Sequence, residues 1–265
     1  MPIIATDQLI KNYLAHNDYT IESQRKMIIK PITDFFEKHT PTTLQSLLIS
    51  HGLFQAEKTT KKTLIDWVNQ EQWTLINNQF KSLMKEWNGP DVAIFILPVD
   101  FSNHVIQKSF HGVTGVSFAD NIILFINHRI QDLYIKALLA HEYSHTIRLR
   151  NLHNQQDLIS LKDTIILEGI AEVITQRKYG VSFLSKDKVN EETIKKSYLQ
   201  WIKPHLSIRS NHPLHSFIMY GGDQLEQRIG YQVGTYIVKS WLKMHPVNLV
   251  TLFREPTESF FKSLE

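Results

Sequence analysis

The chain has 265 residues, of which 42% are hydrophobic and 21% charged, and its formal net charge is +3 with neutral histidines. This size and composition exclude a disordered chain and suit one large domain or two small ones. The mild basic excess lacks the Lys/Arg stripe of a nucleic-acid binder. Because cysteine is absent, disulfides, thiolate catalysis and thiolate metal ligands are excluded, so His, Asp or Glu must hold any metal.

The beginning of the chain has neither the basic start nor the continuous apolar core of a signal peptide. No apolar stretch approaches the roughly 18 residues that would cross a bilayer. These observations predict a cytoplasmic protein with no membrane span. No feature of the sequence indicates its oligomeric state.

Residues 1–89 are predicted to form a helical N-terminal region. Residues 21–39 have helical apolar spacing, which Pro31 can kink or divide. Residues 63–87 have the spacing of one long helix whose tryptophans and aliphatic side chains form a core stripe. Asn-Gly-Pro then ends the pattern, and we expect a second domain over residues 90–265.

The periodicity changes after this break. Residues 92–97 and 121–127 are apolar runs bounded by turn residues, as is typical of buried strands, and residues 114–118 are a candidate third strand. The remaining chain again has mostly helical spacing. The predicted fold class is therefore α+β and mostly helical, with a small sheet before the central helix and a helical C-terminal part.

That central helix contains the HExxH sequence, from His141 to His145. Two histidines four residues apart stand on one face of a helix, about 5.4 Å apart along its axis, so both imidazoles can reach one metal ion. Glu142 points beside that ion, where it can take a proton from a water molecule. The pattern is typical of zinc hydrolases.

The motif alone is weak evidence, because it would arise by chance in roughly one such chain in thirty. The alternative is that His141 and His145 are ordinary helix residues. The context favours the metal site, since the apolar segment Leu138-Leu139-Ala140 precedes the motif and a predicted strand comes before it.

The identity of the third ligand distinguishes between classes of zinc site. A metzincin would have a glycine and a third histidine at set distances after His145, but Arg148 and Asn151 occupy these positions. His153 is a less favoured ligand because it follows in a predicted loop. A catalytic zinc needs a third protein ligand and an open fourth position.

Glu168 is the preferred third ligand, which would complete a His₂Glu site for one zinc ion. It shares a helix face with Glu172, which we expect to accept a hydrogen bond from the second ring nitrogen of His141. The alternative is a pair of solvated glutamates. The apolar residues around both carboxylates make that alternative less favourable.

These motifs resemble those of a bacterial family of predicted zinc-dependent proteases, known mainly as a domain of unknown function and related to the gluzincins. The resemblance covers residues 92–244 and rests on HEYSH, Leu-Glu-Gly-Ile-Ala-Glu, Met-Tyr-Gly and Gly-Tyr-Gln-Val-Gly. It implies a His-His-Glu zinc, the glutamate of HExxH as the base, and a second helix with two acidic residues four apart.

The resemblance also suggests Tyr231 as the donor to the oxyanion, where gluzincins often place Tyr or His. The alternative is that Gly230 and Gly234 only let this helix pack closely, with Tyr231 as a packing residue. Tyr220, Tyr236 and His215 are lesser candidates.

A peptide substrate could bind by adding a strand to the sheet. We expect this at residues 121–127, with Asn121, Ile123 and Phe125 as contacts, unless the strand has no exposed edge. The predicted function is a zinc metallopeptidase acting on peptides or proteins, with endopeptidase favoured over aminopeptidase. The alternatives are a non-catalytic zinc-containing peptide-binding or regulatory module, and a helical regulator whose HExxH is accidental.

Overall fold

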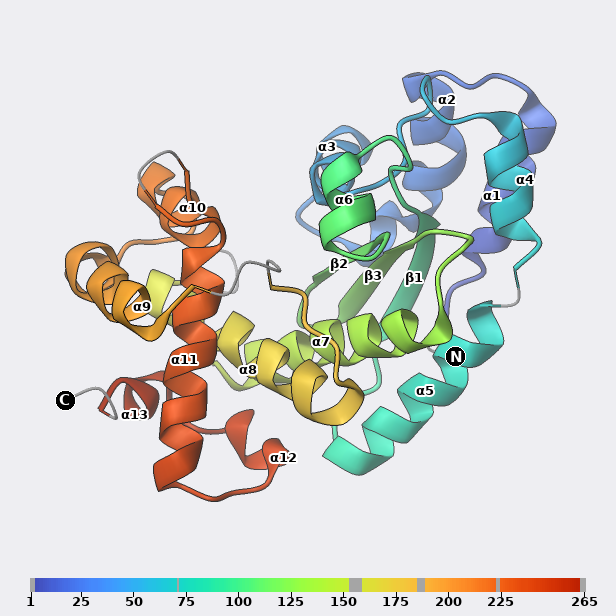
Figure 1. Cartoon of the computed structure of the whole chain (residues 1–265). Coiled ribbons are helices and arrows are strands. Elements are labelled where there is room, and N and C mark those ends of the chain that lie inside the picture. Colours follow the sequence, from blue (N-terminus) through green and yellow to red (C-terminus); the bar gives the residue numbers. More distant parts are fainter. Residues whose placement is uncertain (1–2, 71, 153–158, 185–188, 223–224, 263–265) are drawn as a thin grey trace. The chain divides into compact units, whose positions relative to one another are not determined.

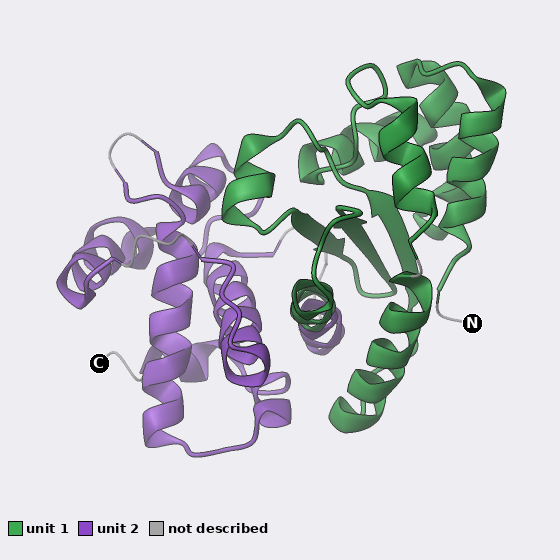
Figure 2. Ribbon diagram, turned by 45° about the vertical axis from the view of Figure 1, so that its right-hand side comes forward, with its two compact units in different colours: residues 1–142 green, residues 143–265 purple. Residues whose placement is uncertain are grey.

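The computed structural model describes residues 3–70, 72–152, 159–184, 189–222 and 225–262. They form two compact units, Met1–Glu142 and Tyr143–Glu265, which Figure 2 shows in green and purple. The boundary falls inside one helix, α7 (Asp132–Asn151), which carries the HExxH motif. The predicted functional division near residue 89 stays a prediction, and His153 lies outside the described residues.

Unit 1 contains a three-stranded sheet with the order β1-β3-β2. All three predicted strands are confirmed. β1 is parallel to β3, and β2 is antiparallel to it. Figure 1 shows β3 between the other two strands. The strands are β1 (Ala93–Pro98), β2 (Val113–Ser117) and β3 (Asn121–Ile126).

The expectation that a peptide adds to residues 121–127 is wrong, because β3 is the central strand and pairs with a neighbour on each side. Ile123 and Phe125 are fully buried, and Asn121 is only 8% exposed. The amide of Asn121 donates to the backbone oxygen of Phe35 instead. A strand buried on both faces reads as a continuous apolar run, which carries no information about its place in the sheet.

The N-terminal helices of unit 1 differ from prediction in their continuity. The helix expected over residues 63–87 is two helices, and Trp67 and Trp73 pack edge to face across the break. Pro31 stands near the start of a 3₁₀ segment after a π-helical turn, as its missing N–H favours. The helical elements before α7 are α1 (Thr6–His16), α2 (Ile21–Gln24), η1 (Arg25–Ile29), η2 (Lys30–Phe35), α3 (Pro41–His51), α4 (Lys61–Val68), α5 (Gln72–Trp87) and α6 (His104–Ser109).

Unit 2 is helical, as the helical spacing of this part of the sequence predicts. Among the described residues, no helix combines the length and apolarity needed to cross a membrane. The elements after α7 are α8 (Leu161–Tyr179), α9 (Glu191–Ser197), η3 (Tyr198–Ile202), η4 (Lys203–His205), α10 (Pro213–Tyr220), α11 (Ile229–Met244), α12 (Leu249–Leu252) and α13 (Thr257–Phe261).

The core of unit 2 is the crossing of α8 and α11, which lie side by side in Figure 1. The two helices meet at Gly169 and Gly234. A Cβ on Gly169 would overlap the backbone of Gly234, and a Cβ on Gly234 would overlap the backbone oxygen of Ile165. Only glycine allows the two backbones to come this close.

Arg148 ties the end of α7 to the C-terminal helices. Its guanidinium donates to the backbone oxygens of Leu252 and Glu255 and to the hydroxyl of Thr257, at 2.9–3.0 Å. It is only 1% exposed, and burial lowers its pKa to about 10. These bonds fix the last turns of the helix that presents His145.

Candidate metal centre

The helix α7 presents both histidines of the motif. His141 is 8% exposed and His145 6% exposed, so neither imidazole is an ordinary surface side chain. They stand one helical turn apart on one face, as the spacing predicts.

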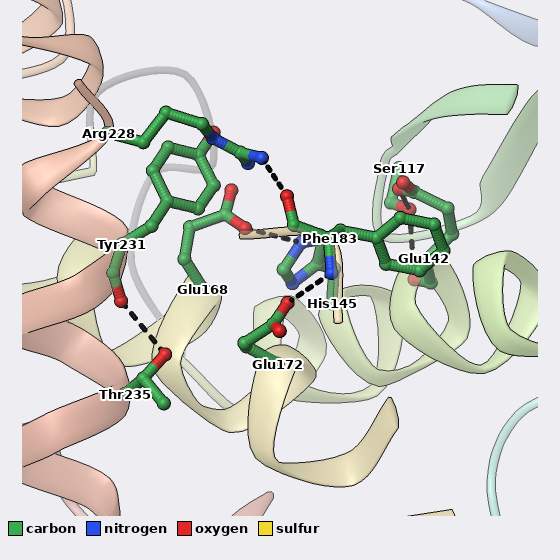
Figure 3. A network of polar contacts seen from close by, with 9 residues as sticks. All are labelled: Ser117, Glu142, His145, Glu168, Glu172, Phe183, Arg228, Tyr231 and Thr235. Carbon is green, nitrogen blue, oxygen red and sulfur yellow. Dashed lines mark hydrogen bonds and ion pairs between the residues drawn. The ribbon is translucent and has the colours of Figure 1, made fainter. Parts of the chain in front are cut away.

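The helix α8 supplies the third candidate ligand. Nε2 of His145 lies 3.4 Å from Oε2 of Glu168. A dashed line marks this contact in Figure 3. One donor atom each of His141, His145 and Glu168 can be chosen so that all three lie within 4.8 Å of one another. The structure therefore brings together the three predicted ligands.

These residues fit zinc in both chemistry and size. Two imidazoles and one carboxylate are a donor set of catalytic zinc sites. Two ligand atoms bound at about 2.0–2.1 Å to a tetrahedral zinc lie about 3.3 Å apart. The 3.4 Å between His145 and Glu168 matches that spacing, so these two groups need little movement to bind a common ion.

Glu142 is held by two residues of β2. The hydroxyl of Ser117 lies 2.5 Å from Oε2 of Glu142 and 2.9 Å from its backbone oxygen, and it can donate to either. Gly115 leaves room for the same side chain, because a Cβ there would lie 2.7 Å from Cγ, Cδ and Oε1 of Glu142. The candidate base is thus fixed from the sheet and is only 5% exposed.

His51, at the end of α3, is a further titratable group near the candidate base. Burial lowers its pKa, and the negative charge of Glu142 opposes part of that shift. The sequence did not predict His51, Ser117 or the role of Gly115. No motif spacing links them to Glu142, since only the pairing of the strands and the packing of α3 bring them near it.

Glu172 has its hydrogen-bond partners on α8 and in the segment that follows it. Its carboxylate accepts hydrogen bonds from Ser182 Oγ at 2.5 Å, from Gln176 Nε2 at 2.7 Å and from the backbone N–H of Phe183 at 3.2 Å. These bonds satisfy a side chain that is 1% exposed, and they hold the segment that follows α8. All three bonds lie within unit 2, and the expected hydrogen bond to His141, which belongs to unit 1, stays a prediction.

Tyr231 lies beside Glu168 in unit 2 and is 8% exposed (Figure 3). Its pKa is raised well above the ordinary value, mainly by burial and further by the charge of Glu168 and the neighbouring Tyr220. The glycines flanking it do serve close packing: Gly230 lies against Met219, and Gly234 against α8. Packing explains the two glycines, whereas Tyr231 itself faces the third candidate ligand.

The lesser candidates lie in different surroundings. Tyr220 is 55% exposed, with its ring centre 5.9 Å from that of Tyr231. His215 is buried, its Nε2 lies 3.0 Å from the hydroxyl of Thr164, and burial lowers its pKa. Tyr236 donates to Glu191 on α9. The charge of Glu168 contributes to the raised pKa of Tyr231.

Comparison with known proteins places these observations in a family. Residues 72–262 match the family described as "Predicted Zn-dependent protease (DUF2268)". The chain belongs to this family. It is 30% identical over 216 residues to the uncharacterized protein YjaZ of Bacillus subtilis. This alignment covers 81% of the chain and 83% of that relative. It is 23% identical over 175 residues to the uncharacterized protein YjfC of the same organism, or 61% of the chain and 57% of that relative.

No solved structure matches the chain. The family match covers α7, α8 and α11, and hence every residue of the candidate metal centre. It leaves out most of the N-terminal helices, including α3 with His51. The family description and the three clustered donors agree on a metal site.

Proposed function

We propose that this protein is a zinc-dependent peptide-bond hydrolase of the gluzincin type, with one zinc ion held by His141, His145 and Glu168. The observation that carries the proposal is the clustering of these three donors, with His145 and Glu168 already at the spacing of zinc ligands. Membership in a family of predicted zinc-dependent proteases supports it.

A bound zinc would supply a Lewis acid that polarises the scissile carbonyl and makes water more acidic. Glu142 would take the proton from the attacking water and deliver it to the leaving amine. Its contact with Ser117 keeps the carboxylate in one orientation through both transfers. The proton thus moves from water to glutamate to amine, and the glutamate returns to its starting state.

Tyr231 would donate its hydroxyl to the oxyanion that develops on the carbonyl. A phenol with an ordinary pKa is already protonated at neutral pH, and burial raises the pKa of Tyr231 further, so it remains a donor. A donor to the oxyanion must lie beside the metal ligands, and Tyr231 lies near Glu168.

The outer strand β2 replaces β3 as the candidate site for the peptide backbone. Phe118 N–H donates to Asn121 O at 2.8 Å, so the even-numbered residues of β2 bond to β3. Gly115 and Ser117 therefore direct their N–H and C=O groups to the other side, beside Glu142. A strand edge binds backbone and not chain ends, which favours an endopeptidase.

The test compares cleavage of a peptide library by wild-type protein, chelated protein and Glu142→Gln. We expect cleavage by the wild type alone, with zinc still bound by Glu142→Gln because the variant keeps all three ligands. Cleavage by Glu142→Gln would place the base elsewhere. A zinc-loaded wild type that cleaves no peptide would favour the alternative of a non-catalytic peptide-binding module.

A further inference from the structure

A short segment after α8 connects Glu172 to Arg228, which stands just before α11. Residues 181–184, which we call the strap, are held by Glu172 through the side chain of Ser182 and the N–H of Phe183. The backbone oxygen of Phe183 accepts a hydrogen bond from the guanidinium of Arg228. Figure 3 shows this chain of contacts from Glu172 to Arg228.

Arg228 then reaches Tyr231. Its guanidinium carbon lies 3.9 Å from the centre of the Tyr231 ring, which is close stacking. A planar guanidinium can stack on a ring and donate to a carbonyl at the same time, as an ammonium cannot. The phenol is therefore covered on one face by a group that is itself tied to the strap.

The backbone of Arg228 supports a dedicated role. Arg228 stands just before α11 with φ 57° and ψ 34°, in the left-handed region. That conformation is strained for a residue other than glycine. Its N–H donates to the backbone oxygen of Tyr220 at 2.8 Å, which helps to hold this conformation. An arginine at a position that favours glycine indicates that its side chain is needed.

We propose that Arg228 is a positioning residue that holds the hydroxyl of Tyr231 beside Glu168, and that Glu172 acts on the same tyrosine by fixing the strap. The consequence for catalysis rests on the proposed function, whereas the positioning of Tyr231 does not. This inference gives Glu172 a task that differs from orienting a metal-ligating histidine. It also predicts that Glu172, Arg228 and Tyr231, from two stretches of unit 2, act as one group.

The first test observes Tyr231 directly, without activity or metal. The nine tyrosines are labelled with 3-fluorotyrosine, and the ¹⁹F signal of Tyr231 is the one missing from Tyr231→Phe. We expect Arg228→Met, which keeps the length but removes charge and donors, to shift that signal. Arg228→Lys should shift it less. The matched control is Arg177→Met, an exposed arginine in the last turn of α8, which should leave it unchanged.

Glu172→Gln is expected to move the same signal in the direction of Arg228→Met, because the neutral amide loosens the strap. An unchanged Tyr231 signal in Arg228→Met would overturn the proposal. A shift in Arg228→Met without one in Glu172→Gln would overturn the part that assigns Glu172 to the strap. If Arg228→Met does not fold, the comparison of Arg228→Lys with wild type decides in the same way.

The second test measures peptide cleavage by the zinc-loaded enzyme. Arg228→Met should lower kcat about 10- to 100-fold, as losses around an active site commonly do, with KM changed by less than about twofold. In a Tyr231→Phe background the same substitution should have little further effect, since its target is gone. An equal loss in both backgrounds would contradict the positioning role. If the wild type cleaves nothing, the proposed function fails while the ¹⁹F result still decides the role of Arg228.

Discussion

The carboxylates of Glu142 and Glu168 each depend on a glycine, but in different ways. Gly115 leaves room for the side chain of Glu142, and the hydroxyl of Ser117 then holds it. Gly169 leaves room for the backbone of α11, and so sets the distance between two whole helices. The first device places one side chain, whereas the second places every residue on the facing surfaces of α8 and α11.

This difference predicts which property a substitution in each region should impair. A methyl group that meets a side chain can be relieved by a change of rotamer. One that meets a backbone must move a helix. Changes near Glu142 should therefore impair catalysis and spare the fold, whereas changes at the helix crossing should impair stability and metal binding together.

The largest effect is expected for Gly169→Val. Its side chain would overlap the backbone of Gly234, so we expect a loss of about 3 kcal/mol or more in the free energy of unfolding. Zinc affinity should fall as well, because α8 carries Glu168. Thermal melting and zinc titration measure both effects.

The control is Gly180→Ala, where a Cβ meets nothing within 4 Å and the cost is that of its positive φ, about 1 kcal/mol. Equal losses in the two variants would show that the close crossing of α8 and α11 is not needed.

The next effect is expected for Gly115→Ala. The added methyl would displace the carboxylate of Glu142, and a displacement of about 1 Å can lower kcat by about 100-fold. Zinc content and melting temperature should stay near those of the wild type. A variant that keeps full kcat would show that Glu142 need not occupy its observed position.

A smaller effect is expected for Ser117→Ala. It removes one hydrogen bond to a carboxylate and adds no bulk, so kcat should fall by about tenfold. KM should change little unless the hydroxyl also contacts substrate. A Ser117→Thr variant keeps the hydroxyl and should recover part of kcat; no recovery would favour a purely steric role.

The smallest effects concern two histidines, one in each unit. Burial lowers the pKa of both His51 and His215, and the charge of Glu142 raises that of His51 only. Glu142→Gln should therefore lower the pKa of His51 further and leave that of His215 unchanged, as measured by NMR titration. A shift in both would show that the substitution perturbs more than the local charge.

Both histidines also make stability depend on pH with a defined sign. In the folded protein, the pKa of each histidine lies below its unfolded value of about 6.5. Between the folded and the unfolded pKa, the unfolded chain therefore binds more protons than the folded protein. The free energy of unfolding should therefore rise as pH increases towards 6.5 and decrease in more acidic solution. Urea unfolding of His51→Gln should show a shallower dependence than the wild type.

The sequence predicted the metal ligands because they lie on two helices, where spacing alone determines which side chains share a face. His141, His145 and Glu168 are brought together as that spacing implied. Glu172 shares the face of Glu168 in the predicted helix, but its partners come from the strap, which has no periodic pattern.

The order of the strands, and hence the residues around Glu142, were less predictable from the sequence for a physical reason. Strand order depends on pairings between distant segments, so an apolar run such as β3 can be central or outer with the same sequence. The positions of Ser117, Gly115 and His51 near Glu142 follow from that order and from the packing of α3. Helix breaks such as the one between Trp67 and Trp73 also depend on packing rather than on local propensity.

The most direct test is the zinc content of untreated wild-type protein, measured by elemental analysis together with that of Glu168→Ala. We predict one equivalent of zinc in the wild type, anomalous scattering at His141, His145 and Glu168, and loss of the metal in the variant. Wild-type protein with less than about half an equivalent, and no uptake on reconstitution, would contradict the claim that these residues form a zinc site.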